Sequence, residues 1–263
     1  MVEFQLVSDL HLKYDANRDR YSSPVEHVHP KAPILVLAGD IGSLYHPSAL
    51  KFALQELKDL FRIVLYVPGN HEYYMPKDCG SNRLTIKQLT DRLYALEEIS
   101  GLHILDRRSV KIGNVCIAGC TLWSDPSIKV PPYIVRIHGI SDTIYKSMHR
   151  RDLLYLQKVK NYCKARNHDL IVVTHYSPSH STLKGCKRNN KMSSLYASNL
   201  DHLFNDPIVA WCYGHTHHNT DTVVNGMRLV SNQLGKPTDG TKDFNTSCLI
   251  SSSQKAKKVK KNP

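Results

Sequence analysis

The sequence predicts an α/β fold built on parallel β-strands. Three features indicate it: short apolar runs of strand length, helical spacing of apolar residues between some of them, and a polar motif directly after five of the runs. Strands that alternate with helices are typical of parallel sheets with right-handed crossovers. The chain of 263 residues is 41% hydrophobic and 22% charged, which suits one globular domain.

The N-terminal part alternates strands and helices. A polar loop over residues 12–32 follows the first strand. Pro47 favours the start of one helix and Gly101 the end of the next, because proline suits the first helical position and glycine suits a helix C-terminus. The expected elements are strands 2–7, 34–39 and 62–67 and helices 47–60 and 82–99.

The C-terminal part has shorter strands and longer loops. Residues 119–147 show no clear periodicity, and so long a segment in a compact domain is typically functional. Its Trp123 and Tyr133 suit a substrate lid, with core packing as the alternative. A basic loop is expected at 178–192. The expected elements are strands 103–105, 109–112, 114–119, 170–174, 208–213, 227–231 and 244–250 and helices 148–166 and 194–204.

The net charge of +12 is partly concentrated in one lysine-rich run near the C-terminus. We therefore expect one domain over residues 1–250 and a disordered tail over 251–263. The tail suits a nuclear address or a weak contact with nucleic acid, and a merely solvated tail is the alternative.

Several classes of protein are disfavoured. No apolar run approaches the ~18 residues of a membrane span, and the N-terminus does not resemble a signal peptide. The seven cysteines contain no CxxC pair, which argues against a disulfide framework and against a thiolate zinc site. We expect a cytoplasmic protein, with the nucleus as the alternative because of the lysine-rich tail. The oligomeric state stays open.

Polar motifs follow five of the predicted strands. Ligands of open α/β sheets gather at the carboxyl ends of strands, so the motifs are expected to meet at one edge. Asp9 and His11 are two residues apart, so both side chains project to the same side of extended chain, and His215 and His217 repeat that spacing. The motifs are Asp9-Leu10-His11, Gly39-Asp40, Gly69-Asn70-His71-Glu72, Thr174-His175 and Gly214-His215-Thr216-His217.

These side chains predict a centre with two divalent metal ions. Asp40 follows a glycine, which lets the backbone approach an ion, and one aspartate can bridge two cations. Asn70 adds an amide oxygen and His175 an imidazole. Carboxylate, amide and imidazole ligands without thiolate suit Mn²⁺, Fe or Zn²⁺, of which we expect Mn²⁺.

His71 directly follows the predicted ligand Asn70. Its imidazole can protonate the leaving alkoxide, hold a phosphoryl oxygen, or orient a ligand from outside the metal shell. The sequence leaves these roles open and favours a direct one.

Taken together, the motifs resemble the calcineurin-like metallophosphoesterase superfamily, whose pattern D-x-H, G-D, G-N-H-[DE], H, G-H-x-H is complete over residues 9–217. The resemblance implies a small single-domain member with a four-layer sandwich of two mixed β-sheets flanked by helices. It implies one metal bound by Asp9, His11, Asp40 and His217, and a second bound by Asp40, Asn70, His175 and His215. It also implies phosphate-ester hydrolysis by a metal-bridging hydroxide, with His71 and Asp40 as catalytic residues and Asn70 and His71 in contact with substrate.

The resemblance leaves the substrate open. The second motif lacks the longer signature of phosphoprotein phosphatases, and Ser43 stands where purple acid phosphatases have a tyrosine ligand. A phosphomonoester or phosphodiester is expected, carried by a small molecule, a nucleotide or a phosphoprotein. The alternatives are a nucleic-acid-directed phosphodiesterase or nuclease, and a non-catalytic metal-binding scaffold.

Overall fold

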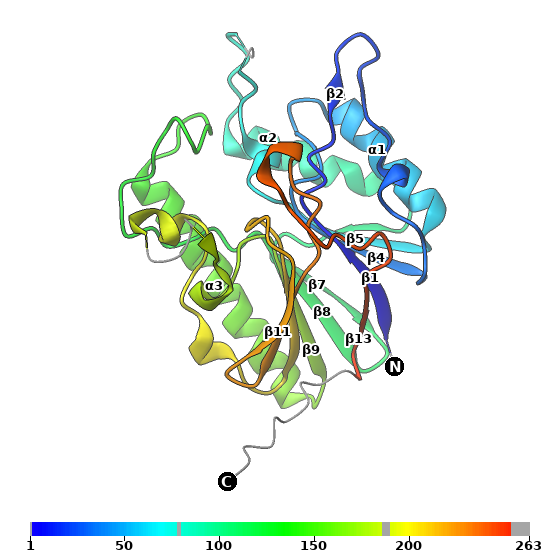
Figure 1. The fold of residues 1–263 in the computed structure, drawn as a ribbon, viewed down its shortest axis with the longest axis vertical. Helices are drawn as coiled ribbons and strands as arrows, with labels where there is room; N and C mark the ends of the chain where they lie inside the picture. The colour runs from blue at the N-terminus through cyan, green and yellow to red at the C-terminus, as the bar shows by residue number, and fades with distance from the viewer. Residues whose placement is uncertain (1, 78–79, 186–189, 254–263) are drawn as a thin grey trace.

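Two mixed β-sheets face each other, with helices on their outer faces, in a computed structural model that describes residues 2–77, 80–185 and 190–253 (Figure 1). This confirms the predicted α/β sandwich. The first sheet has five strands, in the order β13 (Leu249–Ser251), β1 (Glu3–Val7), β4 (Ile34–Ala38), β5 (Ile63–Val67) and β6 (Leu102–Ile104). β1, β4, β5 and β6 pair in parallel, and β13 pairs antiparallel to β1.

The second sheet has six strands, whose four inner members are parallel. Its two edge strands pair antiparallel. The order is β11 (Thr220–Val224), β12 (Met227–Ser231), β10 (Ile208–Tyr213), β9 (Asp169–Thr174), β8 (Val115–Cys120) and β7 (Arg108–Ile112).

The three α-helices of the described residues begin at positions that suit a helix N-terminus. α1 (Pro47–Leu60) starts with a proline, α2 (Ile86–Ala95) with a capping box made by Thr85 and Gln88, and α3 (Asp142–Ala165) with a Ser141 side chain that accepts from a backbone N–H. α1 and α2 lie over the first sheet and α3 over the second (Figure 1).

Successive side chains along each strand point to opposite faces of the sheet, and this divides the core into layers. Leu6, Val36 and Val173 point between the two sheets, where they form one apolar cluster. Their neighbours Leu35 and Leu37 belong to another cluster that includes the buried faces of the helices. Since successive side chains of a strand point to opposite faces, strands buried on both faces read as continuous apolar runs. The sandwich therefore fixes both sheets rigidly against each other.

The predicted helix over 194–204 is wrong. The structure has 3₁₀ turns there, η6 (Lys191–Leu195) and η7 (Asp201–Leu203). Between them the backbone bonds to a distant segment: the Ser198 N–H donates to the Ser177 carbonyl at 3.0 Å and the Leu200 N–H to the Pro178 carbonyl at 2.9 Å. These tertiary hydrogen bonds replace those of a helix.

Other boundaries also differ from the expectation. α3 begins six residues before the predicted start, because Ser141 caps it, and α2 is shorter than 82–99. The loop over 12–32 contains a hairpin of β2 (Tyr14–Asp15) and β3 (Arg20–Tyr21). Strand 244–250 contracts to β13, whose Ser251 pairs with Glu3. Residues 254–263 of the tail lie outside the described residues.

The membrane-span prediction can be compared with the helices directly. In the part of the chain that the structure describes, none of the helices combines the length and the apolar character needed to cross a bilayer.

Candidate metal centre

The predicted ligands meet where the two sheets end. β1, β4 and β5 of the first sheet and β9 and β10 of the second each lead directly into one motif. The two sheets are joined there, because the His215 N–H donates to both carboxylate oxygens of Asp9 at 3.0–3.1 Å, while the Gly214 N–H donates to the His175 carbonyl within the second sheet at 2.9 Å. The structure thus brings all seven predicted ligands and His71 to one edge.

Five of the seven predicted ligands adopt the left-handed backbone conformation, which costs a non-glycine residue about 1 kcal/mol or more. Backbone hydrogen bonds hold them there: Asp9 N–H donates to the Gly39 carbonyl and His11 N–H to the Asp40 carbonyl, both at 2.9 Å. Strain of this kind clusters at functional sites. The five are Asp9, His11, Asp40, His215 and His217, with φ between 41° and 66°.

A glycine makes close approach possible at the end of β5. A Cβ atom on Gly69 would collide with the Asp40 carboxylate and with the Asp40 backbone nitrogen. Any larger residue would therefore displace Asp40 or the turn that carries Asn70 and His71. This explains on steric grounds why the third motif begins with glycine.

The first cluster consists of Asp9, His11 and His217. The His217 Nε2 atom lies 3.2 Å from the Asp9 Oδ1 atom and 3.1 Å from the His11 Nε2 atom. Ligand atoms that bind one ion at about 2.0–2.2 Å lie about 3.0–3.5 Å apart. These three side chains are therefore arranged as ligands of one cation would be.

The second cluster consists of Asp40, His175 and His215, with Asn70 beside it. The His175 Nε2 atom lies 3.3 Å from the Asp40 Oδ1 atom and 2.8 Å from the Asn70 Oδ1 atom. Its Nδ1 atom lies 2.9 Å from the Ala38 carbonyl oxygen, which fixes the ring and directs Nε2 toward the cluster.

Asp40 lies between the two clusters, and the surroundings of its carboxylate oxygens indicate whether the clusters fit metal ions. Its Oδ1 atom faces His175, while its Oδ2 atom lies 3.7 Å from the His11 Nε2 atom and 3.9 Å from the His71 Nε2 atom. Asp40 is 1% exposed, yet Oδ2 has no hydrogen-bond partner among the described residues. A buried carboxylate oxygen without a donor is unfavourable, and a cation would satisfy it. The donor set therefore fits two divalent ions that share Asp40.

The electrostatics suit cations as well. Burial raises the pKa of Asp9, but the hydrogen bond with His217 and the nearby His175 outweigh it and lower the pKa to about 2. Burial lowers the pKa of His71 to about 4, with Asp40 opposing the shift. For His175 burial is outweighed by Asp40, and the pKa rises to about 9. The carboxylates are thus ionised and concentrated where a cation would bind.

Residues around the ligands were not found by sequence reasoning. Glu72 is buried and accepts from the N–H groups of Asp40, Ile41 and Gly69 and from the Tyr66 hydroxyl, at 2.6–3.1 Å. It joins the second and third motifs. The signal in the sequence that could have identified Glu72 is its position in the third motif.

Two further residues support His217. The Gln233 Oε1 atom accepts from the His217 N–H at 2.7 Å, and the Asp239 Oδ2 atom lies 2.6 Å from the His217 Nδ1 atom. Both lie in the segment after β12, and Asp239 closes the 3₁₀ helix η8 (Pro237–Asp239). Nothing in the sequence near them signals a metal centre.

The two aromatic residues of the segment predicted as a lid lie in different environments. Trp123 is buried and packs with Tyr73, Tyr145 and Tyr176, which is the core-packing alternative. Tyr133 is 78% exposed and lines a cavity beside the metal centre.

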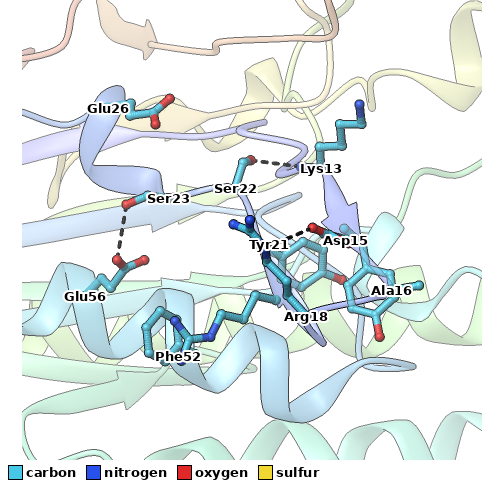
Figure 2. A pocket seen from close by; sticks show the side chains of 12 residues that line it. Lys13, Asp15, Ala16, Arg18, Tyr21, Ser22, Ser23, Glu26, Phe52 and Glu56 are labelled. Carbon is cyan, nitrogen blue, oxygen red and sulfur yellow. Dashed lines mark hydrogen bonds and ion pairs between the residues drawn. The ribbon is translucent and has the colours of Figure 1, made fainter.

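A larger cavity lies away from this centre. It has a volume of about 1040 Å³ and is enclosed by the β2–β3 hairpin and α1, with Arg18, Ser23, Phe52 and Glu56 among its residues (Figure 2). Its polar groups bond to one another, as Ser23 does to Glu56 at 3.2 Å. None of the metal-type clusters found among the described residues includes a residue of this cavity, so size alone does not identify the site.

Comparison with known proteins gives a family match. The sequence profile described as calcineurin-like phosphoesterase matches residues 4–219, which contain all five motifs. A curated relative, protein L509 of Acanthamoeba polyphaga mimivirus, is 28% identical over 258 residues and covers 87% of this chain and 89% of its own length.

Solved structures share the fold. A phosphopantetheinyl hydrolase from Mycobacterium tuberculosis matches with a TM-score of 0.63 at 17% identity, covering 94% of this chain and 95% of that one. A dimetal phosphatase from Danio rerio matches with a TM-score of 0.53 at 14% identity, covering 87% of this chain and 86% of that one. At these identities the likeness concerns the fold.

Proposed function

The chain belongs to the calcineurin-like phosphoesterase family, and we propose that it is a metal-dependent phosphoesterase that hydrolyses phosphomonoester or phosphodiester bonds with two divalent cations. The observation that carries the proposal is the buried Asp40 carboxylate, which lies between two clusters of ligand-type side chains and leaves one oxygen without a hydrogen bond among the described residues. Mn²⁺ is the proposed metal, with Fe and Zn²⁺ as alternatives.

In this proposal Asp9, His11, Asp40 and His217 hold one ion, and Asp40, Asn70, His175 and His215 hold the other. When bound, such a pair of ions polarises the phosphoryl group and lowers the pKa of water toward about 7. Asp40 contributes a carboxylate to both positions, and its fixed geometry keeps the two positions together.

His71 differs from the ligands in its position. Its side chain is 32% exposed and lines the cavities beside the cluster, and its Nε2 atom faces the Asp40 Oδ2 atom at 3.9 Å. From there the ring can donate a hydrogen bond to a phosphoryl oxygen of a bound ester or pass a proton to the leaving oxygen. Either role makes it a catalytic residue that does not hold the metal.

A pair of chromogenic esters tests the proposal. The metal-loaded protein should hydrolyse p-nitrophenyl phosphate, bis-p-nitrophenyl phosphate or both. Asp40→Asn should lose about 10³-fold or more in kcat/KM, equivalent to roughly 4 kcal/mol of transition-state stabilisation, because an amide cannot bridge two cations. The matched control Asp91→Asn, at an exposed i,i+4 ion pair on α2, should keep wild-type activity.

Two outcomes would contradict the proposal. Full activity and metal content in Asp40→Asn would show that the centre lies elsewhere. Hydrolysis of neither ester, with metal bound, would favour the non-catalytic scaffold. The nucleic-acid-directed alternative predicts instead a binding that weakens steeply with salt and when residues 254–263 are removed.

A further inference from the structure

Two cavities adjoin the metal centre and share part of their lining. Each has a volume of about 370–380 Å³, within the size range of small-molecule sites. We call them the tyrosine cavity, which includes Tyr133 and Tyr196, and the hairpin cavity, which includes Tyr14 and His46. Both are lined by Asp40, His71, Tyr74, Arg136 and Lys236.

The tyrosine cavity combines polar residues of the metal centre with aromatic and apolar side chains, among them Tyr133, Tyr176 and Tyr196. Its innermost ring, Tyr176, lies against His215 with centroids 4.0 Å apart, and Tyr196 lies 5.5 Å from the same histidine. At the rim Tyr133 is 78% exposed, although it is a large aromatic residue. The exposed Tyr133 ring can contact a planar group that extends from the metal centre through this cavity.

The hairpin cavity has a different wall. The Tyr14 ring stacks on His46 with centroids 3.7 Å apart, and the Tyr21 hydroxyl accepts a hydrogen bond from the Ser43 N–H at 2.7 Å. Both tyrosines also line the large outer cavity, so the β2–β3 hairpin contributes to the walls of both spaces. This side offers mixed polar and aromatic contacts.

Two cationic residues, Arg136 and Lys236, line both cavities. The Arg136 carbonyl accepts from the Met75 N–H at 2.7 Å, which ties the loop after β8 to the chain that follows His71. Among the described residues Arg136 forms no ion pair, in contrast to Arg18, Arg107, Arg108 and Arg228. A guanidinium at this place suits the non-bridging oxygens of a phosphoryl group.

We propose that the substrate is a phosphodiester whose phosphorus lies at the metal centre, with a planar aromatic group in the tyrosine cavity and its second organic group in the hairpin cavity. A monoester has one organic group and would leave one cavity unused. In the reaction a water oxygen forms a bond to phosphorus, the bond from phosphorus to one ester oxygen breaks, and a water proton ends on that oxygen. The products are a monoester and an alcohol.

This inference rests on the proposed function, so the first experiment separates the two. We expect the metal-loaded protein to hydrolyse bis-p-nitrophenyl phosphate with a kcat/KM at least about 10-fold above that for p-nitrophenyl phosphate. Efficient cleavage of the monoester with a poorer diester would overturn the inference and leave the proposed function intact. Cleavage of neither would overturn both.

Binding of inert analogues gives a readout that does not depend on turnover. Diphenylphosphinate and methylphenylphosphinate carry the same charge and differ in one aromatic group, and their carbon–phosphorus bonds are not hydrolysed. Calorimetry should show diphenylphosphinate binding about 3–10-fold tighter, the range expected for one aromatic contact. Equal affinities would contradict a site with two occupied sides.

A variant assigns the aromatic group to its cavity. Tyr133→Ala should raise KM for bis-p-nitrophenyl phosphate about 3–10-fold while kcat changes less than about 2-fold, because the ring binds substrate outside the reacting centre. Tyr133→Phe should restore most of the affinity. Leu154→Ala, a truncation of an exposed residue on α3, is the matched control. An unchanged KM in Tyr133→Ala would overturn the assignment.

Discussion

The strand ends and the loops around them are built differently. At the strand ends Asp9, Asp40, Asn70 and His175 are buried, and hydrogen bonds from the His215 N–H to Asp9 cross between the two sheets. The cavities beside them are also lined by loop residues, of which Tyr133 is mostly exposed. The rigid edge therefore suits chemistry that needs fixed geometry, while the loops suit the choice of substrate.

This contrast predicts that strand-end variants affect turnover of every substrate and that loop variants affect only some. After Asp40→Asn, the largest effect is expected from His71→Ala. Its kcat should fall about 10²–10⁴-fold for monoester and diester alike, because the imidazole contacts the phosphoryl group or the leaving oxygen.

The metal content of His71→Ala distinguishes this role from ligation. Elemental analysis should find wild-type metal content, since the side chain is not among the proposed ligands. Loss of metal would make His71 a ligand, and a change for one ester only would place it with the loop residues.

Asp239 is an exception to the difference between strand ends and loops, because it lies outside the strand ends and yet contacts the strand-end residue His217. Asp239→Ala should weaken divalent metal binding about 10–100-fold, since the carboxylate orients the His217 imidazole and makes it more basic. Titration with Mn²⁺ measures the affinity, and the unfolding temperature of the metal-free protein serves as the structural control.

A purely structural role would change the unfolding temperature and leave the metal affinity unaltered. Asp239→Asn keeps an acceptor for His217 without the charge, and we expect an affinity between those of Asp239→Ala and the wild type. The smallest of these effects is the substrate-selective one of Tyr133→Ala.

Sequence reasoning found the strand ends because their signal is local. Each motif directly follows an apolar run, so the same few residues specify a buried strand and the ligand at its end. Parallel pairing brings strand ends together within each sheet, and the packing of the two sheets then brings His175 after β9 close to Asp40 after β4.

The residues that surround the site could not be predicted from local sequence patterns in the same way. Asp239 reaches His217 only because the segment after β12 returns across the strand ends, where the Gly235 N–H bonds to the Asp9 carbonyl at 2.9 Å. The predicted helix over 194–204 failed for a related reason, since its backbone bonds to residues 177–178. Tertiary hydrogen bonds of this kind leave no periodic pattern in the sequence.

The most direct test of the account is the electron paramagnetic resonance spectrum of the protein loaded with Mn²⁺. If Asp40 bridges two ions about 3.5–4 Å apart, two equivalents should bind and give the signal of an exchange-coupled pair, which Asp40→Asn should lose. A single equivalent, or two equivalents with the spectrum of isolated Mn²⁺ ions in the wild type, would contradict a shared dimetal centre.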